Sequence, residues 1–386
     1  MSRAACRVHS GLTILGCFGC GSLYGWSGYL PVVRAHFSVS NATASIVFSL
    51  ALMSFTLGVL LGPVLLAKVS YGFRLPLLAG LATLILSVAG ASTGFLSFAL
   101  TYGLCFGFVS GALYNHAISA ATNSASATFL VPLSVAAFGL GGAVFGPAYV
   151  WLTASGWGLW SLAPAWACLA MVTMLAIVVR PANPPDMIAR MPPQPMMRPN
   201  RKTVVLGIIF AAGSCSGLIV LGFASQILPR GAESVGLASL AIFLATIGNT
   251  LGRLSSAIIA GRVGPVQGIA GALMLSMIAL SGLIFLTTPA MIIGLLFFVA
   301  FAYGQLAATM PLLVKSQVSG PSFSGAFGWV FIGWGIAGLV GPWTAGWVLD
   351  MTGTVRVSLI LCIALAALSL WLTLKVIPPR WTTEDS

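Results

Sequence analysis

Long apolar runs separated by short polar stretches dominate the chain. Each run is long enough for an α-helix to cross a hydrocarbon core of about 30 Å at roughly 1.5 Å per residue. A transmembrane β-barrel would show shorter segments of alternating apolar and polar residues instead. The pattern therefore predicts an all-α membrane protein with twelve transmembrane helices, at residues 11–33, 43–67, 75–93, 96–120, 127–152, 158–179, 203–228, 235–259, 266–286, 289–313, 324–348 and 356–377.

One long polar stretch, residues 180–202, divides six of these runs from the other six. It is rich in proline, and such a segment forms an extended spacer rather than a folded domain. We therefore expect an N-terminal six-helix bundle over residues 1–179, a cytoplasmic linker over 180–202 and a C-terminal six-helix bundle over 203–386. Two bundles of this kind can rock against each other around a site at the membrane midplane.

Composition and charge agree with this pattern. Charged residues make up 6% of the 386 residues and apolar types 59%, whereas a soluble domain has about 25% charged residues. With the N-terminus in the cytoplasm, 13 of the 17 basic residues lie inside, 3 lie outside and Arg253 lies within a span. This positive-inside bias predicts a multi-pass inner-membrane protein with both termini cytoplasmic. The scattered basic residues do not form a nucleic-acid-binding patch, so the bilayer is the expected partner.

Arg253 is the basic residue that falls well inside a predicted span. None of the five acids lies deep in a span, so the pattern offers Arg253 no acidic partner; the acids are Asp186, Glu233, Asp350, Glu384 and Asp385. An arginine fork binds a carboxylate through two charge-assisted hydrogen bonds, which predicts a substrate carboxylate as the partner. The alternative is that Arg253 reaches the inner interface or binds carbonyls of a neighbouring helix.

Aromatic side chains within the spans are the next candidates for this site. A tyrosine or tryptophan deep in a span needs a polar partner, and a common pocket would supply one. The candidates are Tyr24, Tyr114, Tyr303, Phe331 and Trp334. Asn249 precedes Arg253 by one helical turn and is expected to orient it. The alternative for such aromatic residues is a belt at the membrane interface.

The sequence offers little for proton coupling or catalysis. His116, in the fourth predicted span, is the remaining candidate for a proton or hydrogen-bond relay. The alternative is a neutral, hydrogen-bonded histidine near the inner interface, and exchange or uniport therefore gains weight over proton symport. No phosphate-binding loop, metal-ligand cluster or catalytic triad is visible in the sequence. We expect no enzymatic activity and no nucleotide, metal or cofactor.

Small residues and one proline suggest how the helices pack and bend. Gly103, Gly107 and Gly111 share one face of the fourth predicted span, and such spacing lets helices approach closely. Pro147 follows a glycine-rich stretch in the fifth span. A proline at membrane depth bends a helix and frees a carbonyl, so this place is a candidate hinge.

Several segments together resemble the major facilitator superfamily, and more narrowly its branch of oxalate/formate antiporters and monocarboxylate transporters. They are YGWSGYLP (24–31), GFVSGALYN (107–115), FGLGGAVFGP (138–147), GNTLGR (248–253) and FGWVFIGWGIAGLVGP (327–342). The resemblance implies the major facilitator fold and alternating-access transport of a small organic anion. It also implies that Arg253 binds the anion and that Tyr24, Tyr114, Tyr303 and Phe331 line an aromatic chamber.

The chain departs from this family at its gates. Gly72 and Arg74, after the second predicted span, and Arg262 and Gly264, after the eighth, match the family's cytoplasmic gate motifs. The acidic residues of both motifs are replaced here, which puts the family's inward-closing ionic network in doubt.

Two further departures concern the anion itself. Asn249 stands where proton-coupled monocarboxylate carriers have an aspartate, and Trp334 stands where oxalate carriers have a lysine. One cation rather than two favours a monoanion, because a second buried negative charge would stay unpaired.

These observations predict a secondary transporter of a small organic anion, most simply a monocarboxylate, working by exchange or by facilitated or proton-linked transport. The alternative is a multidrug-type efflux carrier of hydrophobic compounds with the same fold. A third reading is a membrane receptor that keeps the fold without transport. Replacement of Arg253 separates anion transport from efflux of apolar compounds.

Overall fold

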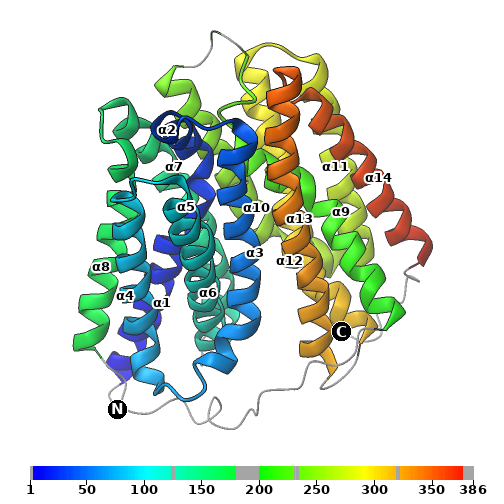
Figure 1. The fold of residues 1–386 in the computed structure, drawn as a ribbon. Helices are drawn as coiled ribbons and strands as arrows, with labels where there is room; N and C mark the ends of the chain where they lie inside the picture. The colour runs from blue at the N-terminus through cyan, green and yellow to red at the C-terminus, as the bar shows by residue number, and fades with distance from the viewer. Residues whose placement is uncertain are drawn as a thin grey trace.

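A computed structural model describes residues 3–122, 127–179, 200–229, 231, 234–318 and 322–376. These residues form long helices that run side by side, with no β-strand among them (Figure 1). Eleven helical segments are long and apolar enough to cross a membrane, and each overlaps one of the predicted spans from the second to the twelfth. The prediction of an all-α, multi-pass membrane protein is therefore confirmed.

The first predicted span, residues 11–33, is not one helix. It falls in three consecutive elements: α1 (Arg3–Cys20), the 3-10 helix η1 (Gly21–Gly25) and α2 (Trp26–Phe37). Glycines begin and end η1, and both lie so close to the backbone of another helix that a Cβ would clash there. Glycine also weakens a regular helix, which explains the break. A twelfth crossing by these three elements stays a prediction.

Among the described residues, the rest of the N-terminal half contains seven helical segments besides a short π-helical one. They are α3 (Asn41–Leu65), α4 (Tyr71–Gly90), α5 (Phe95–Phe98), the π-helical η2 (Ala99–Phe106), α6 (Gly107–Thr122), α7 (Ala127–Ala154), the 3-10 helix η3 (Gly158–Leu162) and α8 (Ala163–Val178). The fourth predicted span is therefore built from α5, η2 and α6. Its apolar run is continuous in the sequence, so hydropathy does not reveal the wider turns of η2.

The described part of the C-terminal half contains six helices. They are α9 (Arg201–Phe223), α10 (Val235–Val263), α11 (Pro265–Phe285), α12 (Pro289–Gln317), α13 (Ser322–Thr352) and α14 (Arg356–Val376). α9 begins at Arg201, and Asn200 caps it by accepting a hydrogen bond from the Thr203 amide at 2.9 Å, so residues 201 and 202 of the predicted linker are helical. Residues 180–199 of that linker lie outside the described residues.

The two halves of the chain repeat one packing pattern. α3 packs on α6 as α10 packs on α12, α4 packs on α8 as α11 packs on α14, and α1 packs on α7 as α9 packs on α13. Between the halves, α3 lies against α13 and α7 lies against α10. Figure 1 shows α1, α4 and α8 on one side and α9, α11 and α14 on the other.

Glycines allow the closest of these contacts. In α6, Gly111 faces the Phe55 carbonyl of α3, and in α10, Gly252 faces the Phe301 carbonyl of α12. A Cβ at either glycine would collide with that backbone oxygen. The close packing predicted from the glycine spacing of the fourth span is therefore present, and α10 and α12 repeat it in the other half.

Candidate functional site

Arg253 lies in α10, partly buried, and is held by two polar side chains. Its Nε donates a hydrogen bond to Asn249 Oδ1 at 3.2 Å, and its Nη2 donates one to the Tyr24 hydroxyl at 3.1 Å. Asn249 is one helical turn earlier on α10 and fully buried. The structure thus contains the Asn249–Arg253 contact that the helical spacing predicted.

Two tyrosines from different halves of the chain cover the guanidinium. The Arg253 Cζ lies 5.9 Å from the ring centroid of Tyr24, in η1, and 6.0 Å from that of Tyr303, in α12. At such distances the ring quadrupole attracts the cation. The two hydroxyl oxygens are 3.4 Å apart, and Trp334 Nε1, in α13, donates to the Tyr303 hydroxyl at 2.8 Å. Four elements therefore bring one polar chain together.

The other aromatic candidates surround this centre. Phe331 stacks on Trp334 with ring centroids 5.2 Å apart and an interplanar angle of 10°. Tyr114 contacts two phenylalanines that the sequence analysis did not single out: Phe55 and Phe138, each with its ring centroid 5.5 Å from that of Tyr114. Phe55 in turn lies 5.9 Å from Trp334. Neither phenylalanine differs in sequence from an ordinary core position, so no sequence signal marked them.

The centre contains no acid from the described part of the chain. Asp350 is the single acid that the structure describes, and it lies at the end of α13. Its carboxylate accepts hydrogen bonds from the backbone amides of Asn41 and Ala42, at the start of α3, and from the Asn41 side chain. Among the described residues, no group of three or more His, Cys, Asp or Glu could hold a metal ion.

His116 is not part of this centre. It is buried in α6, and its ring packs against His9 of α1, with centroids 6.2 Å apart, and against Tyr71 of α4, at 5.4 Å. Its Nε2 has no hydrogen-bond partner among the described residues. No hydrogen bond in the described residues connects this cluster with Arg253.

The predicted gate residues lie in or next to helices rather than in free loops. Gly72 and Arg74 belong to the first turn of α4, and Arg74 Nε donates to the Val69 carbonyl at 3.0 Å. Arg262 is exposed in the last turn of α10, because this helix runs four residues beyond the predicted end at residue 259. Gly264 joins α10 to α11 with a φ of 84°, a conformation that favours glycine.

The candidate hinge at Pro147 lies inside α7. The glycine before it, Gly146, packs against Gly25 of η1 and Ile242 of α10. The proline is therefore placed where α7 meets both the interrupted first helix and the other half of the chain. Its role as a hinge stays a prediction.

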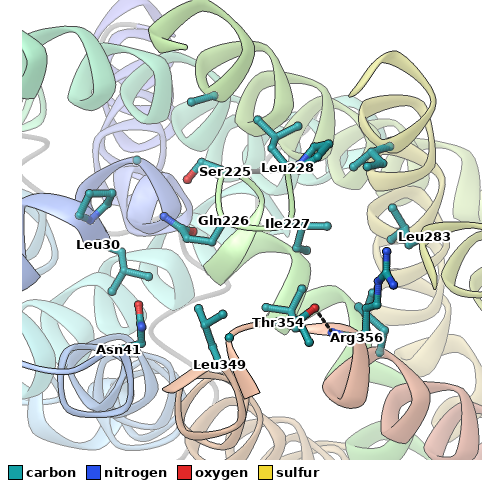
Figure 2. A pocket seen from close by; sticks show the side chains of 18 of the residues that line it. Leu30, Asn41, Ser225, Gln226, Ile227, Leu228, Leu283, Leu349, Thr354 and Arg356 are labelled. Carbon is teal, nitrogen blue, oxygen red and sulfur yellow. Dashed lines mark hydrogen bonds between the residues drawn. The ribbon is translucent and has the colours of Figure 1, made fainter. Parts of the chain in front are cut away.

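A cavity of about 970 Å³ opens at the end of the molecule opposite the start of α1, toward the top of Figure 1. We call it the vestibule. Its lining residues belong to α2, α3, α7 and α10, to residues 225–229, and to the connections α11–α12 and α13–α14 with the adjoining helix ends. Figure 2 shows Ser225, Gln226 and Asn41 on one side of it and Arg356 on the opposite side. Neither Arg253 nor its contacting side chains line the vestibule.

A layer of polar contacts borders the vestibule, since two of its residues line that cavity. Ser27, three residues after Tyr24, meets Ser225 and Gln226, which follow α9. The Ser225 amide donates to Ser27 Oγ at 2.9 Å, and Ser225 Oγ donates to the Ser27 carbonyl at 2.8 Å. Gln226 Nε2 donates to the same carbonyl at 3.2 Å. We call these three residues the floor layer. The sequence does not reveal them, because uncharged polar residues carry no signal for a partner about 200 positions away.

Comparisons with known proteins place this fold. No protein-family model and no curated protein matches the sequence. Among solved structures, a mutant of the nucleoside transporter NupG matches with a TM-score of 0.76 and 14% identity, over 95% of this chain and 99% of that one. A bacterial homologue of the human lysosomal transporter Spinster, in an inward-facing and unoccupied conformation, matches with a TM-score of 0.74 and 14% identity, over 99% and 100%. Both are transporters of the major facilitator type, and this chain has their fold.

Proposed function

We propose that the protein is a secondary transporter of small organic anions, of the monocarboxylate class, and that Arg253 binds the carboxylate. The observation that carries the proposal is that the Arg253 guanidinium lies where the two halves of the chain meet and that its described hydrogen-bond partners are all neutral. Arg253 uses Nε for Asn249 and Nη2 for Tyr24. These bonds use two of the five N–H donors of the arginine, and the described residues offer the others no carboxylate.

A carboxylate is the ligand that such a fork fits best. It accepts two parallel hydrogen bonds from one guanidinium and neutralises its charge. The hydroxyls of Tyr24 and Tyr303 lie next to the cation and can donate to the same ligand. A dianion would leave one charge without a partner, because Trp334 occupies the side of Tyr303 and offers a single neutral N–H.

Transport would proceed by alternating access between two six-helix units, residues 1–179 and 203–386. The repeated packing pattern of the two halves supports this division. The floor layer and the contact of Asp350 with the start of α3 join the units at the vestibule end. The conformation described here would thus be closed on that side. We place the chain in the inner membrane with both termini cytoplasmic and the vestibule outside, as the positive-inside bias indicates.

Rival substrates make less use of the centre. NupG is named as a nucleoside transporter, but a nucleoside is uncharged and would leave Arg253 without a counter-ion. A hydrophobic efflux substrate would use the aromatic side chains and ignore the guanidinium. An Arg253 variant therefore separates the anion proposal from both.

The test is uptake into liposomes that contain the purified protein. Labelled pyruvate, lactate, formate and oxalate would be offered with and without internal substrate and a pH gradient. We expect uptake of a monoanion that falls at least 100-fold in Arg253→Ala and more than tenfold in Arg253→Lys, because lysine keeps the charge and loses the fork. Arg201→Ala, at the exposed start of α9, is the matched control and should transport normally.

Uptake that survives in Arg253→Ala, or the absence of uptake of every acid by a folded protein, would overturn the proposal. Uptake that survives in Arg253→Ala would favour the alternative function, efflux of apolar compounds. Dependence on internal substrate would identify exchange, and dependence on the pH gradient would identify proton coupling.

A further inference from the structure

The vestibule contains two arginines and no acid among its described lining residues. Arg34 comes from α2, and Arg356 is the first residue of α14; both are exposed. Arg230 and Glu233, between α9 and α10 in the sequence, lie outside the described residues and carry opposite charges. The described charge of the vestibule is therefore positive.

Asp350, the described acid nearest to Arg356 in sequence, is engaged at the start of α3 and offsets the charge of the two arginines only in part. Asp350 lies six residues before Arg356, yet it does not line the cavity. Both of its carboxylate oxygens are engaged at the start of α3, where Asn41 N and Ala42 N donate at 3.0 and 2.7 Å. The positive end of a helix dipole further compensates a carboxylate in that place. Asp350 thus leaves the two arginines without an acidic partner in the described chain.

The rest of the lining is suited to small amphipathic molecules. Aliphatic side chains such as Leu30, Ile227 and Leu349 alternate with the polar side chains of Gln226 and Thr354 (Figure 2). A volume of about 970 Å³ far exceeds that of one small acid. The vestibule is therefore roomy enough to collect ligands and too large to grip a single one.

We propose that the vestibule is an anion-collecting chamber, in which Arg34 and Arg356 concentrate small organic carboxylates above the floor layer before they reach Arg253. A cleft with low-dielectric walls and one sign of charge raises the local concentration of the opposite ion. The identity of the ligand rests on the proposed function. The positive potential of the vestibule does not, and it can be measured separately.

The first experiment measures that potential without any transported substrate. Ala154, exposed at the end of α7, lines the vestibule. In Ala154→Cys, the introduced thiol is modified by an anionic and by a cationic methanethiosulfonate of similar size. The ratio of the two rates is compared with the ratio for a free thiol in solution. The unsubstituted protein serves as the control for modification of the native cysteines. We expect the anionic reagent to be favoured. Arg34→Gln and Arg356→Gln should each lower the anion-to-cation rate ratio by about threefold to sixfold, as for a unit charge roughly 10 Å away in a wet site.

Two controls test whether the anion-to-cation rate ratio reports the charges of Arg34 and Arg356. Arg201→Gln, at the other end of the molecule, should leave it unchanged, and about 0.5 M salt should reduce it as the double glutamine variant does. A ratio equal to that of the free thiol, or a ratio unchanged in the double variant, would overturn the proposal.

The second experiment connects the chamber with transport. For uptake from the vestibule side, the double glutamine variant should raise KM severalfold at low salt and leave the maximal rate unchanged. An unchanged KM beside a lowered thiol ratio would mean that the potential exists but does not collect substrate, which also contradicts the proposal. If no acid is transported at all, the proposed function fails, while the thiol ratio still decides whether the vestibule attracts anions.

Discussion

Ser27 Oγ and Ser225 Oγ lie 3.0 Å apart, although 198 positions separate them in the chain. Their contact joins the start of α2 to the segment after α9, and so joins the two halves. It lies three residues beyond Tyr24, which contacts Arg253. The floor layer therefore joins the two halves between lining residues of the vestibule and Tyr24, and we expect it to separate when the vestibule side opens.

A disulfide across this layer should stop transport. The double variant Ser27→Cys with Ser225→Cys brings two thiols to where two hydroxyls now hydrogen-bond, which suits the short span of a disulfide. We expect oxidation to abolish uptake into liposomes and a reducing agent to restore it. Each single variant should transport in both conditions. If protein that is shown to be cross-linked still takes up substrate at the normal rate, the floor layer does not need to separate during transport, and the prediction is wrong.

Loss of the Asp350 carboxylate should favour opening on the vestibule side. Asp350→Ala removes the acceptor for three hydrogen bonds at the start of α3, whereas Asp350→Asn keeps an acceptor oxygen and loses the charge. We expect a thiol in Ser27→Cys to react severalfold faster with an impermeant reagent in the alanine background, and to an intermediate degree in the asparagine background. Equal reactivity in all three backgrounds would show that this contact does not hold the closed state.

The Tyr303 hydroxyl should matter to stability because Trp334 depends on it. Tyr303→Phe leaves the buried Trp334 N–H without its acceptor, and an unpaired buried donor costs about 1–3 kcal/mol. We expect a lower midpoint of thermal unfolding in detergent for Tyr303→Phe. Adding Trp334→Phe removes the orphaned donor and should recover part of the loss. A double variant less stable than the sum of the single effects would contradict this pairing.

Two glycine variants should differ although both lie on transmembrane helices. A Cβ in Gly252→Ala would collide with the Phe301 carbonyl, so α10 and α12 must move apart at a cost of about 1–3 kcal/mol. A Cβ in Gly271→Ala, in α11, meets nothing within 4 Å and should be neutral or stabilising. Thermal unfolding of the two purified variants compares them directly. Equal midpoints would show that the α10–α12 contact is looser than described.

The pH dependence of uptake should not change in His116→Gln. His116 packs with His9 and Tyr71, and no hydrogen bond within the described residues leads from it to Arg253. A proton relay would require such a path. Rates measured from about pH 5 to 8 should give the same profile for both proteins. A flattened profile in the variant would restore the relay that the sequence suggested.

The centre was largely predictable because its residues break local rules. A polar partner is needed by an arginine within an apolar helix, by an asparagine one turn away and by tyrosines deep in the membrane. Residues that share this need are expected to lie together in one site. Phe55 breaks no rule, and its place beside Tyr114 comes from the packing of α3 on α6. Such a contact follows from tertiary structure alone.

Helix boundaries were predicted less well for a different physical reason. Hydropathy reports the membrane, and a helix does not end where the apolar run ends. α10 and α12 both continue for a turn past their apolar runs, to Val263 and Gln317, so Arg262 and Lys315 are helical. The break at η1 was hidden for the converse reason: its residues carry no charge that would interrupt the apolar run, while the backbone changes.

That break has a mechanical consequence. The Tyr24 hydroxyl accepts from Arg253 in the described conformation and must turn if it is to donate to a bound anion, and Tyr24 and Ser27 are three residues apart in one peptide. Ligand entry would then displace the same short segment whose far end seals the vestibule. Binding of the anion at Arg253 and closure of the floor layer are thereby linked through the backbone of one short peptide instead of through a series of side-chain contacts. A substitution that stiffens residues 21–27 should therefore slow both steps together.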